Sequence, residues 1–131
     1  MSKLLFAAAG LTLAAPAMAH HSQAMFNLDK KITVQATVKE FQYTNPHSWL
    51  IATAPGPDGK GAADWSFEST GPLGLSRVGV KAKTFAPGDK VAITANPMKD
   101  GRPGGLLVAV RMPDGHNYVV RPDAGPAAAT H

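Results

Sequence analysis

The chain of 131 residues contains no cysteine, and this absence removes several kinds of chemistry together. Disulfide bonds, thiolate metal sites, cysteine nucleophiles and a lipid-modified N-terminal cysteine are all excluded. Any metal ion must therefore be held by histidine, carboxylate, methionine or main-chain groups.

The common catalytic motifs are also absent. The sequence has no Gly-x-Ser-x-Gly nucleophile elbow, no phosphate-binding glycine loop before a helix and no His-Glu-x-x-His. The only two glutamates, Glu40 and Glu68, do not form a recognisable acid–base pair. The sequence therefore predicts a protein that is not an enzyme.

Long hydrophobic runs are scarce, and the only marked one lies at the start. Lys3 is followed by the apolar stretch 4–15 and then by Ala17-Met18-Ala19, whose small residues suit a signal peptidase. A transmembrane helix needs about 20 apolar residues, so no membrane span is expected. We predict a signal peptide over 1–19 and a periplasmic protein that begins at His20, with cleavage after Ala17 as the alternative.

Basic residues exceed acidic ones only slightly, with 13 Lys and Arg against 9 Asp and Glu. Loss of the signal peptide removes Lys3 and lowers the net charge to +3. The positive charges are scattered, with no run longer than Lys30-Lys31, whereas nucleic-acid-binding proteins cluster them. No nucleic-acid partner is expected.

The sequence contains a series of strand patterns separated by turns. Many of its 13 glycines and 11 prolines lie in these turns. Apolar residues alternate with polar ones from Ile32, which is typical of a half-buried strand. The expected strands are 32–43 with a bend midway, 47–53, 64–68, 90–95, 106–110 and 118–120, with a short helix over 73–78.

This order of elements predicts an all-β fold, a small OB-like barrel of five or six strands with one short helix between the third and fourth strands. A six-stranded sandwich remains the alternative, because both folds bury the same alternating faces. The domain boundaries follow: an N-terminal arm over 20–30, the barrel over 31–120 and a disordered tail over 121–131.

Several short motifs occur in a characteristic order. They are His20-His21-Ser22 at the signal junction, Val38-Lys39-Glu40-Phe41, Thr44-Asn45-Pro46-His47-Ser48-Trp49, Trp65-x-x-Glu68, Pro87-Gly88-Asp89 and Met112-Pro113-Asp114-Gly115. Together they resemble a family of small exported bacterial proteins of unknown function over about residues 19–120. The chain departs from the family pattern at Gln23 and Val80, where an aromatic residue is usual. The resemblance implies export and a small β-barrel, with no established activity.

Histidines are the only side chains with ligand chemistry that are grouped in the predicted mature chain. His20 and His21 would begin it, and His47 begins the second expected strand. A free amine at His20 has a pKa of about 8, so it loses its proton easily and chelates a metal together with its own imidazole. With a third nitrogen from His47, this set favours copper, Cu2+, which leads the divalent affinity order.

Each of these histidines also has a simpler interpretation. His20 and His21 would form a polar, easily cleaved start, and His47 would bond a nearby carbonyl at a strand end. His116 in a turn and His131 at the end of the tail are left out of the predicted site.

Three further residues are candidates for the surroundings of the predicted metal site. Trp49 and Trp65 lie on neighbouring expected strands, and both are expected to be core residues because of the apolar area they bury, with a ligand-binding face as the alternative. Glu68 is expected to be a solvated charge or a partner of Arg77, with the alternative that it orients a histidine ligand.

Two functional hypotheses follow. The first is an exported, non-catalytic binding module that holds copper through His20, His21 and His47. The alternative is a periplasmic module that binds an envelope protein or a small ligand without metal.

Overall fold

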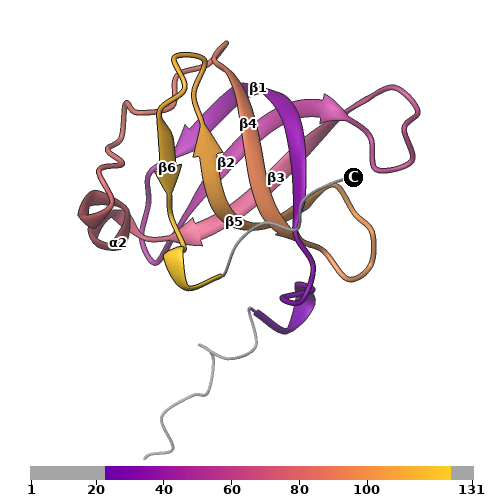
Figure 1. The fold of residues 1–131 in the computed structure, drawn as a ribbon, viewed down its shortest axis with the longest axis horizontal. Coiled ribbons are helices and arrows are strands. Elements are labelled where there is room, and N and C mark those ends of the chain that lie inside the picture. Colours follow the sequence, from indigo (N-terminus) through magenta and orange to yellow (C-terminus); the bar gives the residue numbers. More distant parts are fainter. Residues whose placement is uncertain (1–22, 125–131) are drawn as a thin grey trace, which may run out of the picture.

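The structure is a computed structural model that describes residues 23–124, and six strands make up most of this part (Figure 1). The elements are the 3-10 helix η1 (Gln23–Met25), β1 (Ile32–Gln42), β2 (His47–Pro55), β3 (Ala62–Thr70), the helix α2 (Pro72–Arg77), β4 (Lys90–Pro97), β5 (Gly104–Arg111), β6 (Asn117–Val119) and the 3-10 helix η2 (Pro122–Ala124). The expected strands are all present, although β1 ends one residue before Tyr43 and β3 and β5 are longer than expected.

The strands form one sheet in the order β3-β2-β1-β4-β5-β6, and the sheet closes on itself through a parallel pairing of β3 with β5. All other neighbours are antiparallel, and β6 extends the sheet beyond β5. The single α-helix of residues 23–124, α2, lies between β3 and β4. The prediction of an OB-like barrel is therefore confirmed, and the sandwich is wrong because its two sheets would leave β3 and β5 unpaired.

The long first strand bends at a β-bulge. Up to Val38 the even-numbered residues of β1 point inward, and Ala36 and Val38 are buried. The register shifts between Val38 and Glu40, so that Phe41 packs on the core although its number is odd. An extra residue in one strand increases its local twist, which lets β1 pair with both β2 and β4 around the barrel.

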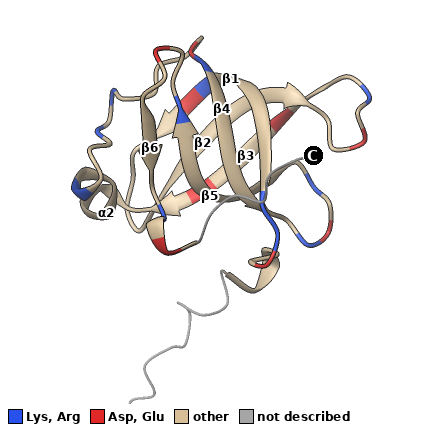
Figure 2. Ribbon diagram, in the orientation of Figure 1, with Lys and Arg blue, Asp and Glu red and all other residues tan. Residues whose placement is uncertain are grey.

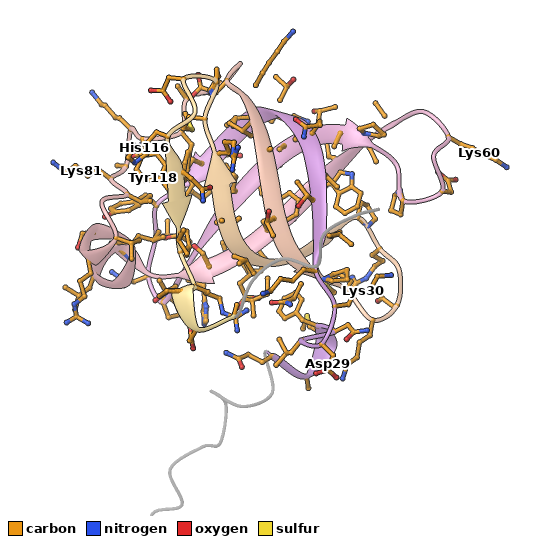
Figure 3. The ribbon with its side chains drawn as sticks, in the orientation of Figure 1. Asp29, Lys30, Lys60, Lys81, His116 and Tyr118 are labelled. Carbon is orange, nitrogen blue, oxygen red and sulfur yellow. The ribbon has the colours of Figure 1, made fainter. Side chains whose placement is uncertain are left out.

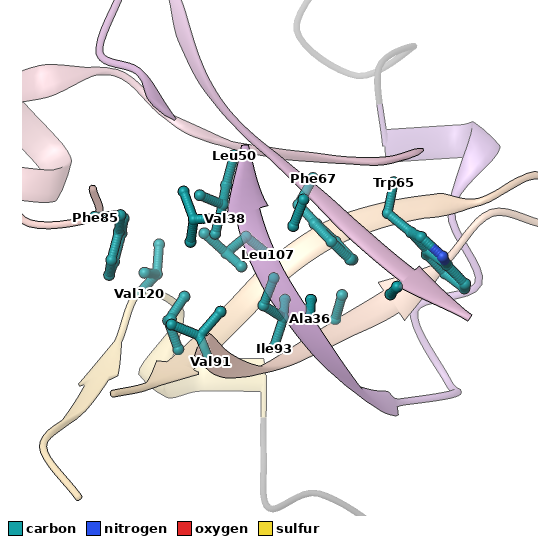
Figure 4. Packing of buried hydrophobic residues seen from close by; sticks show 14 of the residues in the cluster. Ala36, Val38, Leu50, Trp65, Phe67, Phe85, Val91, Ile93, Leu107 and Val120 are labelled. Carbon is teal, nitrogen blue, oxygen red and sulfur yellow. The ribbon is translucent and has the colours of Figure 1, made fainter. Parts of the chain in front are cut away.

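The core fills the barrel with apolar side chains from all of its five strands (Figure 4). Leu50, Phe67, Ile93 and Leu107 are fully buried within it. The rings of Trp65 and Phe67 stack with centroids 5.9 Å apart. Burial of this apolar surface is the main stabilising contribution in a chain without disulfides.

Two adjacent glycines permit the closure of the barrel. A Cβ atom at Gly104 would lie 2.6 Å from the carbonyl oxygen of Ser66, and one at Gly105 would lie 2.5 Å from that of Asn96. Any side chain at either position would push β5 away from its neighbours. The glycines thus allow β5 to approach β3 on one side and β4 on the other, and this places Glu68 beside Leu106.

A buried amide fastens both ends of the described chain to the barrel. The Asn96 side chain, 1% exposed, donates from Nδ2 to the carbonyls of Lys30 (2.7 Å) and Leu28 (3.3 Å). Its Oδ1 accepts a hydrogen bond of 2.8 Å from the Arg121 guanidinium. Ordered contacts therefore continue beyond residue 120, where the sequence predicts the end of the barrel.

Candidate functional site

The outer face of β2 and β3 carries a histidine–carboxylate pair. His47, the first residue of β2, has its Nδ1 atom 3.0 Å from Oε1 of Glu68 on β3. In the ladder His47 lies opposite Thr70, and Glu68 lies opposite Trp49, so the pair is a diagonal contact on one face. Such diagonal neighbours are within reach of long side chains.

Burial makes the Glu68 carboxylate unusual. Its side chain is 7% exposed, whereas that of His47 is 43% exposed. Removal from water raises the pKa of Glu68 above its ordinary value, and the nearby His47 opposes this by favouring the ionised form. The expectation of a solvated charge or a partner of Arg77 is wrong, because the Glu68 side chain is buried and its charged neighbour is His47.

The pair fixes which ring nitrogen of His47 is available to a ligand. Nδ1 is the ring nitrogen next to the Glu68 carboxylate, so Nε2 is the nitrogen left for a ligand. A neighbouring carboxylate favours a proton on Nδ1, and this leaves the lone pair of the neutral ring on Nε2. A carboxylate that holds one nitrogen of a histidine while the other binds a metal is the usual arrangement of protein metal sites. Chemically, the pair supplies one oriented nitrogen ligand.

The turn before β2 holds His47 in place. The hydroxyl of Ser48, which is fully buried, donates to the carbonyl of Thr44 (3.1 Å) and accepts from its N–H (3.2 Å). The Thr44 hydroxyl in turn donates to the carbonyl of His47 at 2.8 Å. The peptide bond between Asn45 and Pro46 is cis. These bonds give residues 44–49 a defined path, which is the structural role of this sequence motif.

The two tryptophans lie on opposite sides of the barrel wall. Trp65 is 5% exposed within the core, and its Nε1–H donates to the carbonyl of Pro55 at 3.0 Å, as expected for a core tryptophan. Trp49 is only half-buried, because it shares the outer face with His47 and lies opposite Glu68. The expectation of a core position for Trp49 is therefore wrong, and its indole ring borders the His47–Glu68 pair.

The other two predicted ligands, His20 and His21, lie outside the described residues. The described arm begins at Gln23 and is held against the segment that follows β4. Phe26 is 3% exposed and forms a β-bridge with Met98, and Met25 accepts a main-chain hydrogen bond from Lys99. The arm thus reaches the outside of the barrel near the end of β4.

Neither a metal-binding cluster nor a membrane-spanning helix is found in the described part of the chain. Within residues 23–124, no three histidine or carboxylate side chains come together in a group that would hold a metal ion. His116 contacts the ring of Tyr118, with centroids 4.3 Å apart, and is not part of the His47–Glu68 pair. No helix of this part of the chain has the length and apolar character needed to cross a membrane.

Sequence reasoning missed the fastening of the arm by Asn96. Asn96 and Leu106 are partners in the β4–β5 ladder, and Leu106 is the partner of Glu68 in the β3–β5 ladder. The anchor of the arm is therefore two strands away from Glu68 on the same face. The only signal in the sequence is a single amide at the end of an apolar strand, just before Pro97.

Comparison with known proteins gives one match. The sequence matches a family of unknown function, DUF6152, over residues 9–109, which is more than half of the chain. No curated protein and no solved structure matches it. The resemblance to a family without an established activity is thus confirmed at that level, and the chain belongs to the family of unknown function DUF6152.

Proposed function

We propose that this protein is an exported, non-catalytic module that binds Cu(II) through His20, His21 and His47. The observation that carries the proposal is the close approach, 3.0 Å, of Nδ1 of His47 to the buried carboxylate of Glu68. A buried carboxylate is costly, and here it lies against Nδ1 of a half-exposed imidazole, which leaves Nε2 for a ligand. This is how a metal-binding histidine is commonly held.

The remaining ligands come from the predicted mature N-terminus. Cleavage after Ala19 gives His20 a free amine, which chelates together with the imidazole of the same residue. An all-nitrogen set of this kind prefers Cu(II) over Zn(II) and Ni(II). The proposal also includes export, because the chelating amine exists only after the signal peptide has been removed.

The fold supports the approach of the N-terminus to His47. Adjacent strands are about 4.8 Å apart, so the two strand steps from Glu68 to Asn96 amount to about 10 Å. Asn96 binds the arm at Leu28 and Lys30. The arm is therefore fastened about two strand steps from Glu68.

A Cu(II) titration of the exported protein tests the proposal. The intact mass first establishes whether the chain begins at His20. His47→Ala should then weaken Cu(II) binding at least tenfold, whereas His116→Ala, which removes an exposed histidine elsewhere, should leave it unchanged. Equal affinity in His47→Ala and the unaltered protein would remove His47 from the site. Absence of any Cu(II) binding would favour the alternative, a module that binds an envelope protein or small ligand without metal.

A further inference from the structure

One mouth of the barrel opens into a groove that is separate from His47 and Glu68. It has a volume of about 680 Å³ and lies between the β2–β3 loop, the β4–β5 loop and the first residues of β1. Ile32 and Val34 point inward but are only half-buried, since they line this mouth, and Trp65 forms its inner end. Mouths of β-barrels with apolar walls are common ligand sites.

The apolar wall of the groove offers contact area and little hydrogen bonding. Pro55, Pro57 and Met98 complete it from the two loops. The indole N–H of Trp65 is already bonded to the carbonyl of Pro55, so Trp65 presents only apolar ring surface to the groove. This wall therefore suits the hydrocarbon part of a ligand.

The rim of the groove is positively charged. Lys30, Lys99 and Arg102 line it, all three are exposed, and no carboxylate is among the lining residues. Lys30 and Lys99 have no side-chain hydrogen bond or ion pair with any of residues 23–124. Figure 2 shows the β4–β5 loop with positive residues on either side of Asp100, whose carboxylate accepts a hydrogen bond of 2.7 Å from Arg102.

We propose that this groove binds a small organic anion with an apolar body, of the fatty-acid type. The hydrocarbon would lie against Ile32, Val34 and Trp65, and the carboxylate would be held at the rim by Lys30 and Lys99. Charge complementarity carries the choice of an anion, because Lys30 and Lys99 lie at the rim of an apolar hollow that no carboxylate lines, with Arg102 beside them bonded to Asp100. The inference is independent of copper, since His47 and Glu68 do not line the groove.

Calorimetric titration of the metal-free exported protein with octanoate tests this inference. Octanoate should bind at least tenfold more tightly than acetate, which lacks the apolar body, and than octanol, which lacks the charge. The double variant Lys30→Ala/Lys99→Ala should lose at least fivefold in octanoate affinity. Lys60→Ala is the matched control, since Lys60 lies in the β2–β3 loop but does not line the groove (Figure 3), and it should keep full affinity.

A second measurement reports where the ligand lies. In Trp49→Phe the only tryptophan is Trp65, so octanoate should change its emission, and acetate should not. No binding of octanoate, equal binding of octanol, or unchanged affinity in the double lysine variant would each overturn the proposal.

Discussion

On the outside of the barrel, Nδ1 of His47 lies 3.0 Å from Oε1 of Glu68, so the two side chains form a histidine–carboxylate pair. The carboxylate is almost fully buried and the imidazole is half-exposed, so the buried partner orients the accessible one. This division is typical of a histidine ligand and the group behind it. The predictions below test what the pair does.

Loss of the Glu68 charge should weaken copper binding without abolishing it. In Glu68→Gln the group that orients His47 is neutral, and loss of such a partner reduces metal affinity by roughly 10–100-fold. Cu(II) titration measures the effect. Glu40→Gln is the control, because Glu40 is the only other glutamate and is exposed on β1. If both variants bind like the unaltered protein, Glu68 does not act through His47.

The raised pKa of Glu68 predicts a pH dependence of stability in the metal-free protein. Because the folded state holds this proton more tightly than the unfolded chain, the stabilising contribution is complete below pH about 4.5 and is lost as the pH rises through the folded pKa. Glu68→Gln has no such proton. Between pH 4 and pH 7 the unaltered protein should therefore lose a stabilising contribution that Glu68→Gln does not have. The free energy of unfolding of Glu68→Gln should rise relative to that of the unaltered protein over this range.

Urea denaturation of both proteins at the two pH values measures this difference. Asp64 and Asp100 have a lowered pKa because of Lys39 and Arg102, and they act in the opposite sense at lower pH. Both proteins contain these pairs, so their effect cancels in the comparison. A stability difference that is the same at pH 4 and pH 7 would contradict the assignment of the raised pKa to Glu68.

Tryptophan fluorescence should show where copper binds. Cu(II) quenches the emission of nearby indoles, and Trp49 lies opposite Glu68 on the face that carries His47. Quenching by one equivalent of Cu(II) should therefore be largely lost in Trp49→Phe. Trp65→Phe should retain it, because Trp65 is inside the barrel. Quenching that follows Trp65 would place the metal elsewhere.

Removal of the Asn96 amide should destabilise the fold. Asn96→Ala leaves the carbonyls of Leu28 and Lys30 and the guanidinium of Arg121 without this partner. Breaking buried hydrogen bonds of this kind costs about 1–3 kcal/mol. Urea denaturation of Asn96→Ala should show that loss, and Asn117→Ala, at an exposed site on β6, should change stability by less than about 0.5 kcal/mol. Equal stabilities would mean that the amide does not fasten the arm.

The architecture could be predicted from the sequence because the strands of this barrel are amphipathic. The alternation from Ile32 to Val38 marks β1, and glycine and proline mark the turns, so the number and order of strands follow from local patterns. The ends of β3 and β5 were less accessible. The added residues of β3 extend its ladder with β2. Gly104 and Gly105 of β5 are placed by pairing with Ser66 and Phe67, a contact between segments far apart in the chain.

Only part of the candidate site could be predicted from the sequence, because its surroundings also depend on contacts between segments far apart in the chain. His47 stood out because it is the only histidine within an expected strand, where it follows Pro46 at the strand start. The burial of Glu68 was not foreseen, because alternation alone places its side chain on the face opposite the core. Trp49 was misplaced because its large apolar area favours the core, whereas its register with Glu68 puts it outside.

The central claim is that His47 is a copper ligand together with the predicted N-terminal histidines. The most direct measurement is the electron paramagnetic resonance spectrum of the exported protein with one equivalent of Cu(II). The spectrum should show an all-nitrogen equatorial ligand set that loses one nitrogen in His47→Ala and is unchanged in His116→Ala. Identical spectra for His47→Ala and the unaltered protein would contradict the claim.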